Sequence, residues 1–176
     1  MKKIVLVQPN FKIGGGSFTG YWLPYSVGCL WSYASQHSWV TDEFEVQDII
    51  YKREAPEQLV DRIQDSTVVF FSCYMWNWEY NKALAELLKR SAPDVKIVFG
   101  GPQISEFYLD TQINDLPFVD TFIVSEGELS FNQYLKDFCK DKTEKIYKNA
   151  LDQGVNIRKV NSKMLAVSFD ERKNLY

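Results

Sequence analysis

Ile97-Val98-Phe99-Gly100-Gly101-Pro102-Gln103 decides the fold, because an apolar run here ends abruptly in two glycines. A short run rich in β-branched and aromatic residues is typical of a strand that is buried on both faces. Glycine after a strand removes the Cβ and lets another backbone, or a ligand, approach closely. The stretch therefore predicts a strand of a parallel sheet that ends beside a binding site.

Two further glycines are expected at the same kind of strand-to-helix turn. They are Gly28 and the glycine of Ser125-Glu126-Gly127-Glu128. Another apolar strand, Val69-Phe70-Phe71, ends in the small hydroxyl residue Ser72. Because parallel strands end at the same edge of their sheet, these turns would together form the floor of a cofactor site.

Apolar runs and helical stripes alternate along the chain. The predicted buried strands are Ile4–Val7, Val68–Phe71, Val95–Phe99 and Phe122–Val124. A fifth strand, Phe44–Ile49, alternates apolar and polar residues, as an edge strand does. The predicted helices lie around the apolar stripes Val27 to Ala34, Leu59 to Ile63, Tyr80 to Leu88 and Phe131 to Phe138. This alternation predicts an α/β fold with a doubly wound parallel sheet.

The edge character of the second strand favours the flavodoxin-like (Rossmann-like) strand order 2-1-3-4-5. The first and third strands would then flank the switch point, with residues 8–22 and 72–78 as its loops. We expect one domain over residues 1–140. Residues 141–176 have weak patterning and are expected to form a tail or linker, with short strands at Lys145–Tyr147 and Leu165–Phe169.

Composition excludes several functions. The 176 residues suit one domain, and the net charge of −3 gives no electrostatic case for nucleic acid or a membrane surface. No apolar run approaches the roughly 18 residues of a membrane span, and the N-terminus does not read as a signal peptide. The three cysteines are too far apart to predict a disulfide framework or a metal pair. We therefore expect a cytoplasmic protein.

Common catalytic and phosphate-binding motifs are missing. The glycines of residues 14–20 lack the Gly-Lys-Ser/Thr ending of a phosphate loop, so a mobile loop is favoured. His37, the sole histidine, follows the first helix and is predicted to be a surface residue. Glu126 and Glu128 could act as an acid and a base, or simply be acids favoured by the dipole of a helix start.

The aromatic cluster Tyr74-Met75-Trp76-Asn77-Trp78 is predicted to lie in a loop at the switch point. Loop side chains at such a point meet a ligand or a partner more often than the core. We therefore favour a binding role over a packing role for this cluster.

Five stretches together resemble the cobalamin-binding domain at the N-terminus of cobalamin-dependent radical S-adenosylmethionine (SAM) enzymes. They cover residues 1–140 and are Val5–Pro9, Leu23–Leu30, Phe70–Tyr74, Val98–Pro102 and Glu126–Phe131. The wider family of cobalamin domains carries Asp-x-His-x-x-Gly, then Ser-x-Leu, then Gly-Gly. Ser72-Cys73-Tyr74 looks like the second motif and Gly100-Gly101 like the third.

If Gly28 is the last glycine of the first family motif, Leu23 stands at the Asp position and Tyr25 at the His position. The resemblance then implies cobalamin (vitamin B12) bound base-off, with no protein histidine on the cobalt and no metal ligand from the chain. It implies no catalytic residue. The cofactor-binding residues that it implies are Gln8, Pro9, Tyr25, Gly28, Ser72, Tyr74, Trp76, Gly100, Gly101, Pro102, Gln103, Glu126 and Gly127.

The resemblance also assigns roles to some of these residues. Ser72 would offer its hydroxyl to the nucleotide tail of the cofactor, while Gly100, Gly101 and Gly127 would give the tail room and backbone N–H donors. Tyr25 would lie below the corrin ring, with Tyr74 and Trp76 beside it.

Radical SAM chemistry needs an iron-sulfur cluster held by Cys-x-x-x-Cys-x-x-Cys, which this sequence does not contain. We therefore expect a truncated protein, an isolated module or one half of a split enzyme, serving a radical SAM or methyl-transfer domain or subunit. Two alternatives stay open. One is a flavin- or nucleotide-binding domain of the flavodoxin type, and the other is an interaction module that binds no cofactor.

Overall fold

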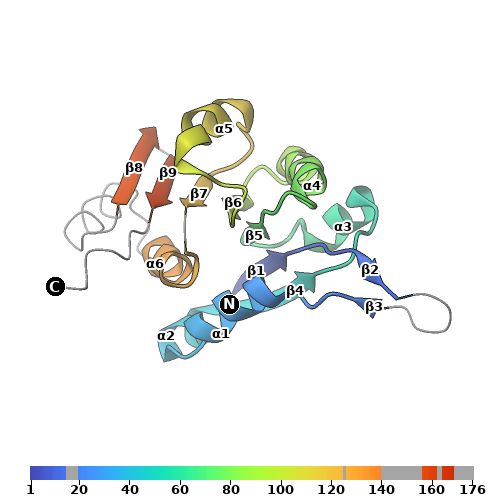
Figure 1. Ribbon diagram of the computed structural model, residues 1–176. Helices are drawn as coiled ribbons and strands as arrows, with labels where there is room; N and C mark the ends of the chain where they lie inside the picture. Colours follow the sequence, from blue (N-terminus) through green and yellow to red (C-terminus); the bar gives the residue numbers. More distant parts are fainter. Residues whose placement is uncertain (15–19, 125, 140–155, 162–163, 169–176) are drawn as a thin grey trace.

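A computed structural model describes residues 1–14, 20–124 and 126–139, and the strand backbones 156–161 and 164–168. A parallel sheet forms its centre, with helices on both faces (Figure 1). Along the sheet the first five strands follow the order β4-β1-β5-β6-β7. Because β4 is the second of these strands in the sequence, this is the predicted order 2-1-3-4-5. The doubly wound, flavodoxin-like prediction is confirmed.

Strands and helices alternate along most of the chain. The parallel strands are β1 (Lys2–Val7), β4 (Phe44–Ile50), β5 (Val68–Ser72), β6 (Lys96–Gly100) and β7 (Thr121–Val124). The helices are α1 (Tyr25–Ala34), α2 (Ser38–Glu43), α3 (Pro56–Ile63), α4 (Trp78–Ser91), the 3-10 turn η1 (Glu106–Tyr108), α5 (Leu109–Asp115) and α6 (Glu128–Phe138).

Alternate strand residues build a separate core on each face of the sheet. In β1, Ile4 and Leu6 face α1, α2 and α6, while Val5 and Val7 face α3, α4 and α5. The two layers of helices are visible below and above the sheet in Figure 1. Successive side chains of a strand point to opposite faces, so a strand covered on both sides is apolar throughout. This is why the strand runs in the sequence are continuous rather than alternating.

The helices begin and end where local chemistry favours it. Pro56 occupies the first turn of α3, where its missing N–H leaves no helical hydrogen bond unmade. The last turn of α4 carries Lys89 and Arg90, whose charges favour the negative end of the helix dipole. The buried side of α4 includes Leu84 and Leu88, as the helical periodicity of the sequence predicts.

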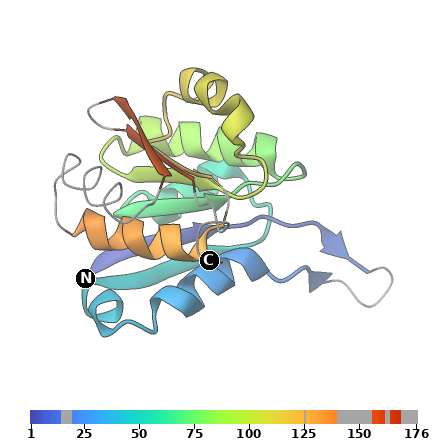
Figure 2. The same ribbon diagram turned by 60° about the vertical axis from the view of Figure 1, so that its left-hand side comes forward.

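Two short strands leave the carboxyl end of β1 as a hairpin. They are β2 (Lys12–Ile13) and β3 (Gly20–Tyr21), which pair antiparallel. Figure 2 shows this hairpin projecting from one end of the molecule. The sequence patterns did not predict the hairpin, α2 or α5, which are all too short to show a period.

At the other end of the sheet lie β9 (Met164–Ser168), parallel to β7, and β8 (Asn156–Asn161), antiparallel to β9. Strand β9 matches the strand expected at Leu165–Phe169, whereas β8 was not predicted and Lys145–Tyr147 lies outside the described residues. The division into a domain of residues 1–140 and a tail of residues 141–176 stays a prediction.

One expectation about the glycines is wrong. Gly28 does not end a strand, because it lies inside α1, three residues after the helix begins at Tyr25. A Cβ added there would meet nothing within 4 Å, so neither a turn nor close packing requires glycine at this position. Pro24 is the N-cap residue of α1 and makes no side-chain cap hydrogen bond.

Candidate functional site

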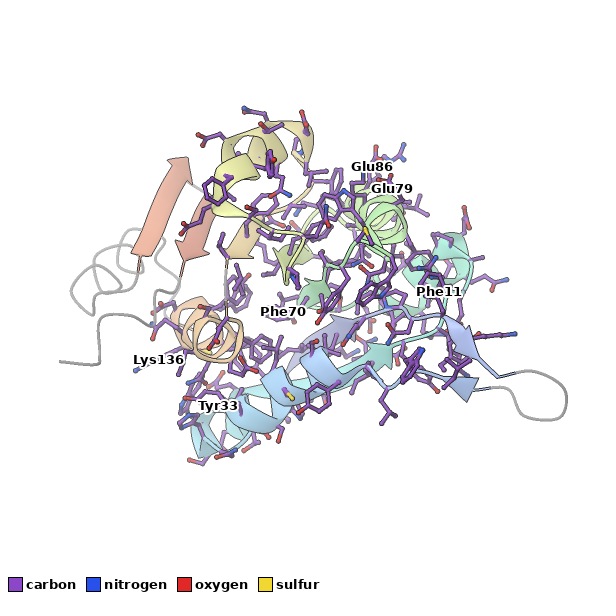
Figure 3. All side chains as sticks on the ribbon, viewed as in Figure 1. Phe11, Tyr33, Phe70, Glu79, Glu86 and Lys136 are labelled. Atoms are coloured by element: carbon purple, nitrogen blue, oxygen red, sulfur yellow. The ribbon has the colours of Figure 1, made fainter. Side chains whose placement is uncertain are left out.

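A pocket of about 190 Å³ opens at the carboxyl edge of the sheet. Strands β5, β6 and β7 form its floor, and the first turns of α1 and α6 form its walls. Figure 3 labels Phe70, a floor residue whose ring packs against Phe131 of α6 at 4.5 Å between centroids. Six of the predicted site residues line this pocket, namely Ser72, Tyr74, Gly100, Gly101, Pro102 and Gly127.

The two adjacent glycines have different structural roles. Gly101 has a φ of +96°, and a Cβ there would lie 2.9 Å from the carbonyl oxygen of Cys73. Only glycine fits, because L residues disfavour this backbone conformation and the neighbouring atom is backbone. A Cβ at Gly100 would make ordinary contact with Ile123, at 3.4 Å. Gly100 therefore leaves space in the pocket, whereas Gly101 closes the turn after β6.

Aromatic side chains and one methionine from the loops after β1 and β5 and from the start of α1 form a largely exposed group, of which Tyr74 lines the pocket. We define this aromatic rim as Phe11, Trp22, Tyr25, Tyr74, Met75 and Trp76. The Tyr74 hydroxyl lies 2.5 Å from the hydroxyl of Ser26, and its ring stacks on Trp76 with centroids 4.4 Å apart. Trp22 is 62% exposed, Met75 83% and Trp76 41%. The rim thus presents apolar side chains to solvent beside the pocket.

Arg53 joins two parts of the rim. Its guanidinium lies 4.4 Å from the centroid of the Phe11 ring and donates a hydrogen bond to the carbonyl of Trp76. Asn10 donates to the carbonyl of Trp22 at 3.2 Å, which ties the segment after the hairpin to the end of β1. Figure 3 shows Phe11 at the base of the hairpin. These contacts place the two loops of the predicted switch point on one surface.

A buried amide positions the aromatic loop, and sequence reasoning missed it. Asn77 is fully buried; its Oδ1 accepts from the backbone N–H of Tyr74 at 2.8 Å, and its Nδ2 donates to the carbonyl of Ser72 at 3.0 Å. Asn81, also fully buried, donates to the same Ser72 carbonyl at 3.3 Å. The only sequence signal was a polar residue between two tryptophans, which did not distinguish a buried amide from an exposed one.

Three other predicted residues support the pocket from outside its lining. Gln8 is buried, and its Oε1 accepts from the backbone N–H of Val27 at 3.3 Å, joining the end of β1 to α1. The carbonyl of Pro9 accepts from Asn77. Gln103 donates its backbone N–H to Cys73 at 3.0 Å, which completes the turn after Gly101. Whether these residues touch a ligand stays a prediction.

Glu126 lies in a neighbouring groove rather than in the pocket. This groove holds about 470 Å³ and shares Gly101 and Pro102 with the pocket. Phe107, which is 93% exposed, lines it as well. Glu128, by contrast, lines the pocket itself at the start of α6. Four apolar residues that line the pocket were not predicted as site residues, because their sequence pattern indicates only burial in the core. They are Val27, Leu30, Val98 and Ile123.

The pKa values of two groups at the site follow from their surroundings. Burial raises the pKa of the Cys73 thiol to about 12, so this residue is neutral and packs as an apolar group. A hydrogen bond to Cys29, with the nearby charge of Glu128, raises the pKa of the exposed Tyr25 hydroxyl. Both groups therefore keep their protons at neutral pH.

His37 lies beyond the end of α1, away from the pocket. It is exposed at the N-cap of α2, and its ring stacks on Trp39. Because α1 starts at the carboxyl edge of the sheet and runs away from it, His37 stands at the opposite edge. Within the described residues, no group of three His, Cys, Asp or Glu side chains is arranged to hold a metal ion. Nor does any helix in the described ranges have the length and apolarity to cross a membrane.

The comparisons with known proteins identify the family of this domain. The family profile described as the B12 binding domain matches residues 12–135, and the chain belongs to this family. The cobalamin-dependent radical SAM methyltransferase TokK of Streptomyces tokunonensis is 29% identical over 119 residues, which are 68% of this chain and 17% of that enzyme. Cobalamin is therefore the cofactor of this domain.

Two other matches carry less functional information. Glycine dehydrogenase (decarboxylating) of Pelagibacter ubique is 66% identical over 62 residues, 34% of this chain but 6% of that enzyme. The isolated REC domain of RcsB from Salmonella enterica serovar Typhimurium has a TM-score of 0.54 at 14% identity, covering 84% of this chain and 96% of that one. The latter match shows the fold alone. The matched part of this chain thus spans only 6% of the glycine dehydrogenase and 17% of TokK.

The size and the apolar lining of the pocket suit a flat aromatic group. An apolar cavity of about 150 Å³ is known to hold one benzene molecule, so a pocket of about 190 Å³ suits a somewhat larger aromatic group. Gly100 keeps this space open, and the apolar side chains of Phe70, Val98 and Ile123 surround it.

Proposed function

We propose that this domain binds cobalamin base-off, with the nucleotide tail of the cofactor inserted into the pocket and no histidine on the cobalt. The observation that carries the proposal is an apolar pocket at the carboxyl edge of the sheet, kept open by the missing side chain of Gly100. In open α/β sheets, ligands bind at this edge, near the point where the strand order reverses.

Two helix starts flank the pocket mouth and support an anionic group there. Ser26 and Val27 belong to the first turn of α1, and Gly127 and Glu128 to the start of α6. The dipole of a helix start favours a phosphate, and this dipole carries the expectation at α1 because the Val27 N–H already donates to Gln8. Helix α1 has no acidic residue in its first turn, whereas α6 has Glu128. The phosphodiester of the tail is therefore expected nearer to α1.

The sequence and the geometry together support the absence of a histidine ligand. The chain contains one histidine, and its position at the opposite edge of the sheet separates it from the pocket. Tyr25, at the position where the resemblance implies histidine, is 76% exposed at the rim. We propose that Tyr25 lies under the corrin, with Tyr74 and Trp76 beside it. Bound cobalamin supplies the cobalt-carbon bond through which a methyl group is carried.

We further propose that the domain serves a radical SAM or methyl-transfer partner, either a further domain or a separate subunit. The similarity to TokK and the exposed aromatic rim support this role. Exposed apolar surface beside a cofactor site commonly marks an interface. A cytoplasmic location stays a prediction.

Titration of the purified protein with hydroxocobalamin tests the proposal. We expect the visible spectrum to shift toward that of base-off cobalamin, with a dissociation constant in the micromolar range or below. Flavin mononucleotide serves as the control, and we expect it not to bind. Tight binding of flavin with no binding of cobalamin would contradict the proposal and favour a flavodoxin-type function.

A further inference from the structure

The pocket has a polar mouth and an apolar depth. Ser72 and Gly100 end their strands, while Phe70 and Val98 lie two residues earlier on the same face and also line the pocket. At about 3.3 Å per strand residue, they lie roughly 7 Å further in. On α1, Leu30 is likewise one helical turn deeper than Ser26.

The polar groups nearest to this depth belong to the mouth, where the Ser72 hydroxyl lies at the end of β5. The Ser26 hydroxyl contacts the Tyr74 hydroxyl, and the N–H of Val27 donates to Gln8. The backbones of β5 and β6 pair with each other along Phe70–Val98 and Phe71–Phe99. A polar atom that enters the depth between Phe70, Val98 and Ile123 therefore loses its water among apolar side chains.

We propose that the pocket selects cobalamin-type cofactors by the polarity of their lower base, favouring 5,6-dimethylbenzimidazole or a phenolic base over adenine. This inference rests on the proposed function, since it requires the nucleotide tail to enter the pocket. Adenine carries an amino group and several ring nitrogens, whereas dimethylbenzimidazole exposes a single ring nitrogen once it leaves the cobalt. Buried polar groups that lack a partner weaken binding substantially.

Val98 and Ile123 are the residues that would determine this selectivity. Both are almost fully buried, both line the pocket, and they come from the neighbouring strands β6 and β7. A hydroxyl introduced at Val98 would give a polar base a partner without a change in side-chain volume. Val69 is equally buried but belongs to the core on the opposite face of the sheet, so it offers a matched control.

The experiment is a calorimetric comparison of four corrinoids with the full chain. They are benzimidazolyl, p-cresolyl and adeninyl cobamides, and cobinamide, which lacks the nucleotide tail. We expect the first two to bind roughly ten- to a hundredfold more tightly than the adeninyl form, a ratio that corresponds to about one or two unpaired polar groups. Cobinamide should bind more weakly than the benzimidazolyl and p-cresolyl cobamides.

The order of the cobamide affinities distinguishes two explanations of selectivity, namely the polarity of the lower base and the strength with which that base coordinates cobalt. Adenine coordinates cobalt less strongly than dimethylbenzimidazole, so a site that only penalises detachment of the base would favour the adeninyl form over the benzimidazolyl form. That order, or equal affinities for the two, would overturn the inference. If cobinamide binds as tightly as all three cobamides, the tail does not use the pocket. If no corrinoid binds, the proposed function itself fails.

Three variants test the assignment to residues. Val98→Thr should narrow the ratio between the benzimidazolyl and adeninyl forms severalfold, whereas Val69→Thr should leave that ratio unchanged. Ile123→Val enlarges the pocket without adding polarity and should also preserve the preference. An unchanged ratio in a folded Val98→Thr protein would overturn the assignment. If that variant does not fold, the ranking of cobamides by the unchanged protein still decides the inference.

Discussion

The pocket and the aromatic rim lie at the same edge of the sheet but differ in construction. Core side chains such as Phe70 and Ile123 form the floor of the pocket, and Gly100 has no side chain to fill it. The rim consists of large side chains in loops, several of them exposed, and a buried Asn77 holds its central loop. The pocket is thus formed by the fold itself, whereas the rim depends on a few hydrogen bonds. Changes in the two regions should therefore have different effects.

The largest effect is expected from Gly101→Val. A branched side chain at φ +96° and 2.9 Å from the Cys73 carbonyl oxygen forces the turn after β6 to move. We expect the free energy of unfolding to fall by about 3 kcal/mol or more, and cobalamin binding to be lost with the fold. Urea denaturation measures the change. If Gly101→Val is as stable as the unchanged protein, the turn after β6 does not require glycine.

Gly100→Val should affect binding more than stability. Its Cβ fits beside Ile123, but the two methyl groups would fill the space of the pocket. We expect cobalamin affinity to fall by roughly a hundredfold, which corresponds to about 2.7 kcal/mol. Val69→Thr is the control, because Val69 belongs to the core on the opposite face of the sheet. If Gly100→Val binds cobalamin normally, the tail does not occupy this pocket.

Asn77→Ala tests the support of the rim. The substitution leaves the Tyr74 N–H without its side-chain acceptor and removes a donor to the Ser72 carbonyl. Unpaired buried groups cost about 1–3 kcal/mol, so the unfolding free energy should fall by that amount. Asn132→Ala is a suitable control, because the side-chain oxygen of Asn132 has no partner. If the free energy of unfolding falls equally in the two variants, the hydrogen bonds of Asn77 do not contribute to stability beyond the loss of an asparagine side chain.

The rim itself should contribute modestly to cofactor affinity. Trp76→Ala removes the ring that stacks on Tyr74 and should weaken cobalamin binding by about three- to tenfold, as expected for one aromatic contact. Trp78→Ala is the matched comparison, because Trp78 packs against Phe99 and the core and should reduce stability instead. If loss of Trp76 abolishes binding, the rim and not the pocket is the principal site.

The pH dependence of stability should be absent near neutral pH and should appear only in the alkaline range. Cys73 holds its proton until about pH 12 in the folded protein, whereas an unfolded thiol ionises near its ordinary value of 9.0. Ionisation therefore favours the unfolded state as the pH rises between these values, and stability should decline across this range. Burial raises the pKa of Tyr80 to about 12 and acts in the same direction. The decline should be shallower in Cys73→Ala; an identical slope would contradict this account.

The sequence predicted more of the fold than of the site. The buried strands and the helical stripes are long enough to show their periods, and β4 shows its edge position by its alternation. Gly28 was misplaced because glycine in a first helical turn looks the same in sequence as glycine in a strand-ending turn. The sequence did not identify Val98 and Ile123 as pocket residues, because an apolar strand residue looks the same whether it faces the core or a cavity. The Asn77 network depends on tertiary contacts that no local pattern records.

Electron paramagnetic resonance of cob(II)alamin bound to the full chain tests the central claim most directly. With the nucleotide tail in the pocket, the base has left the cobalt, and the only histidine lies at the far edge of the sheet. We predict a base-off spectrum without nitrogen superhyperfine splitting. A spectrum that retains the nitrogen triplet, whether from the lower base or from His37, would contradict the account.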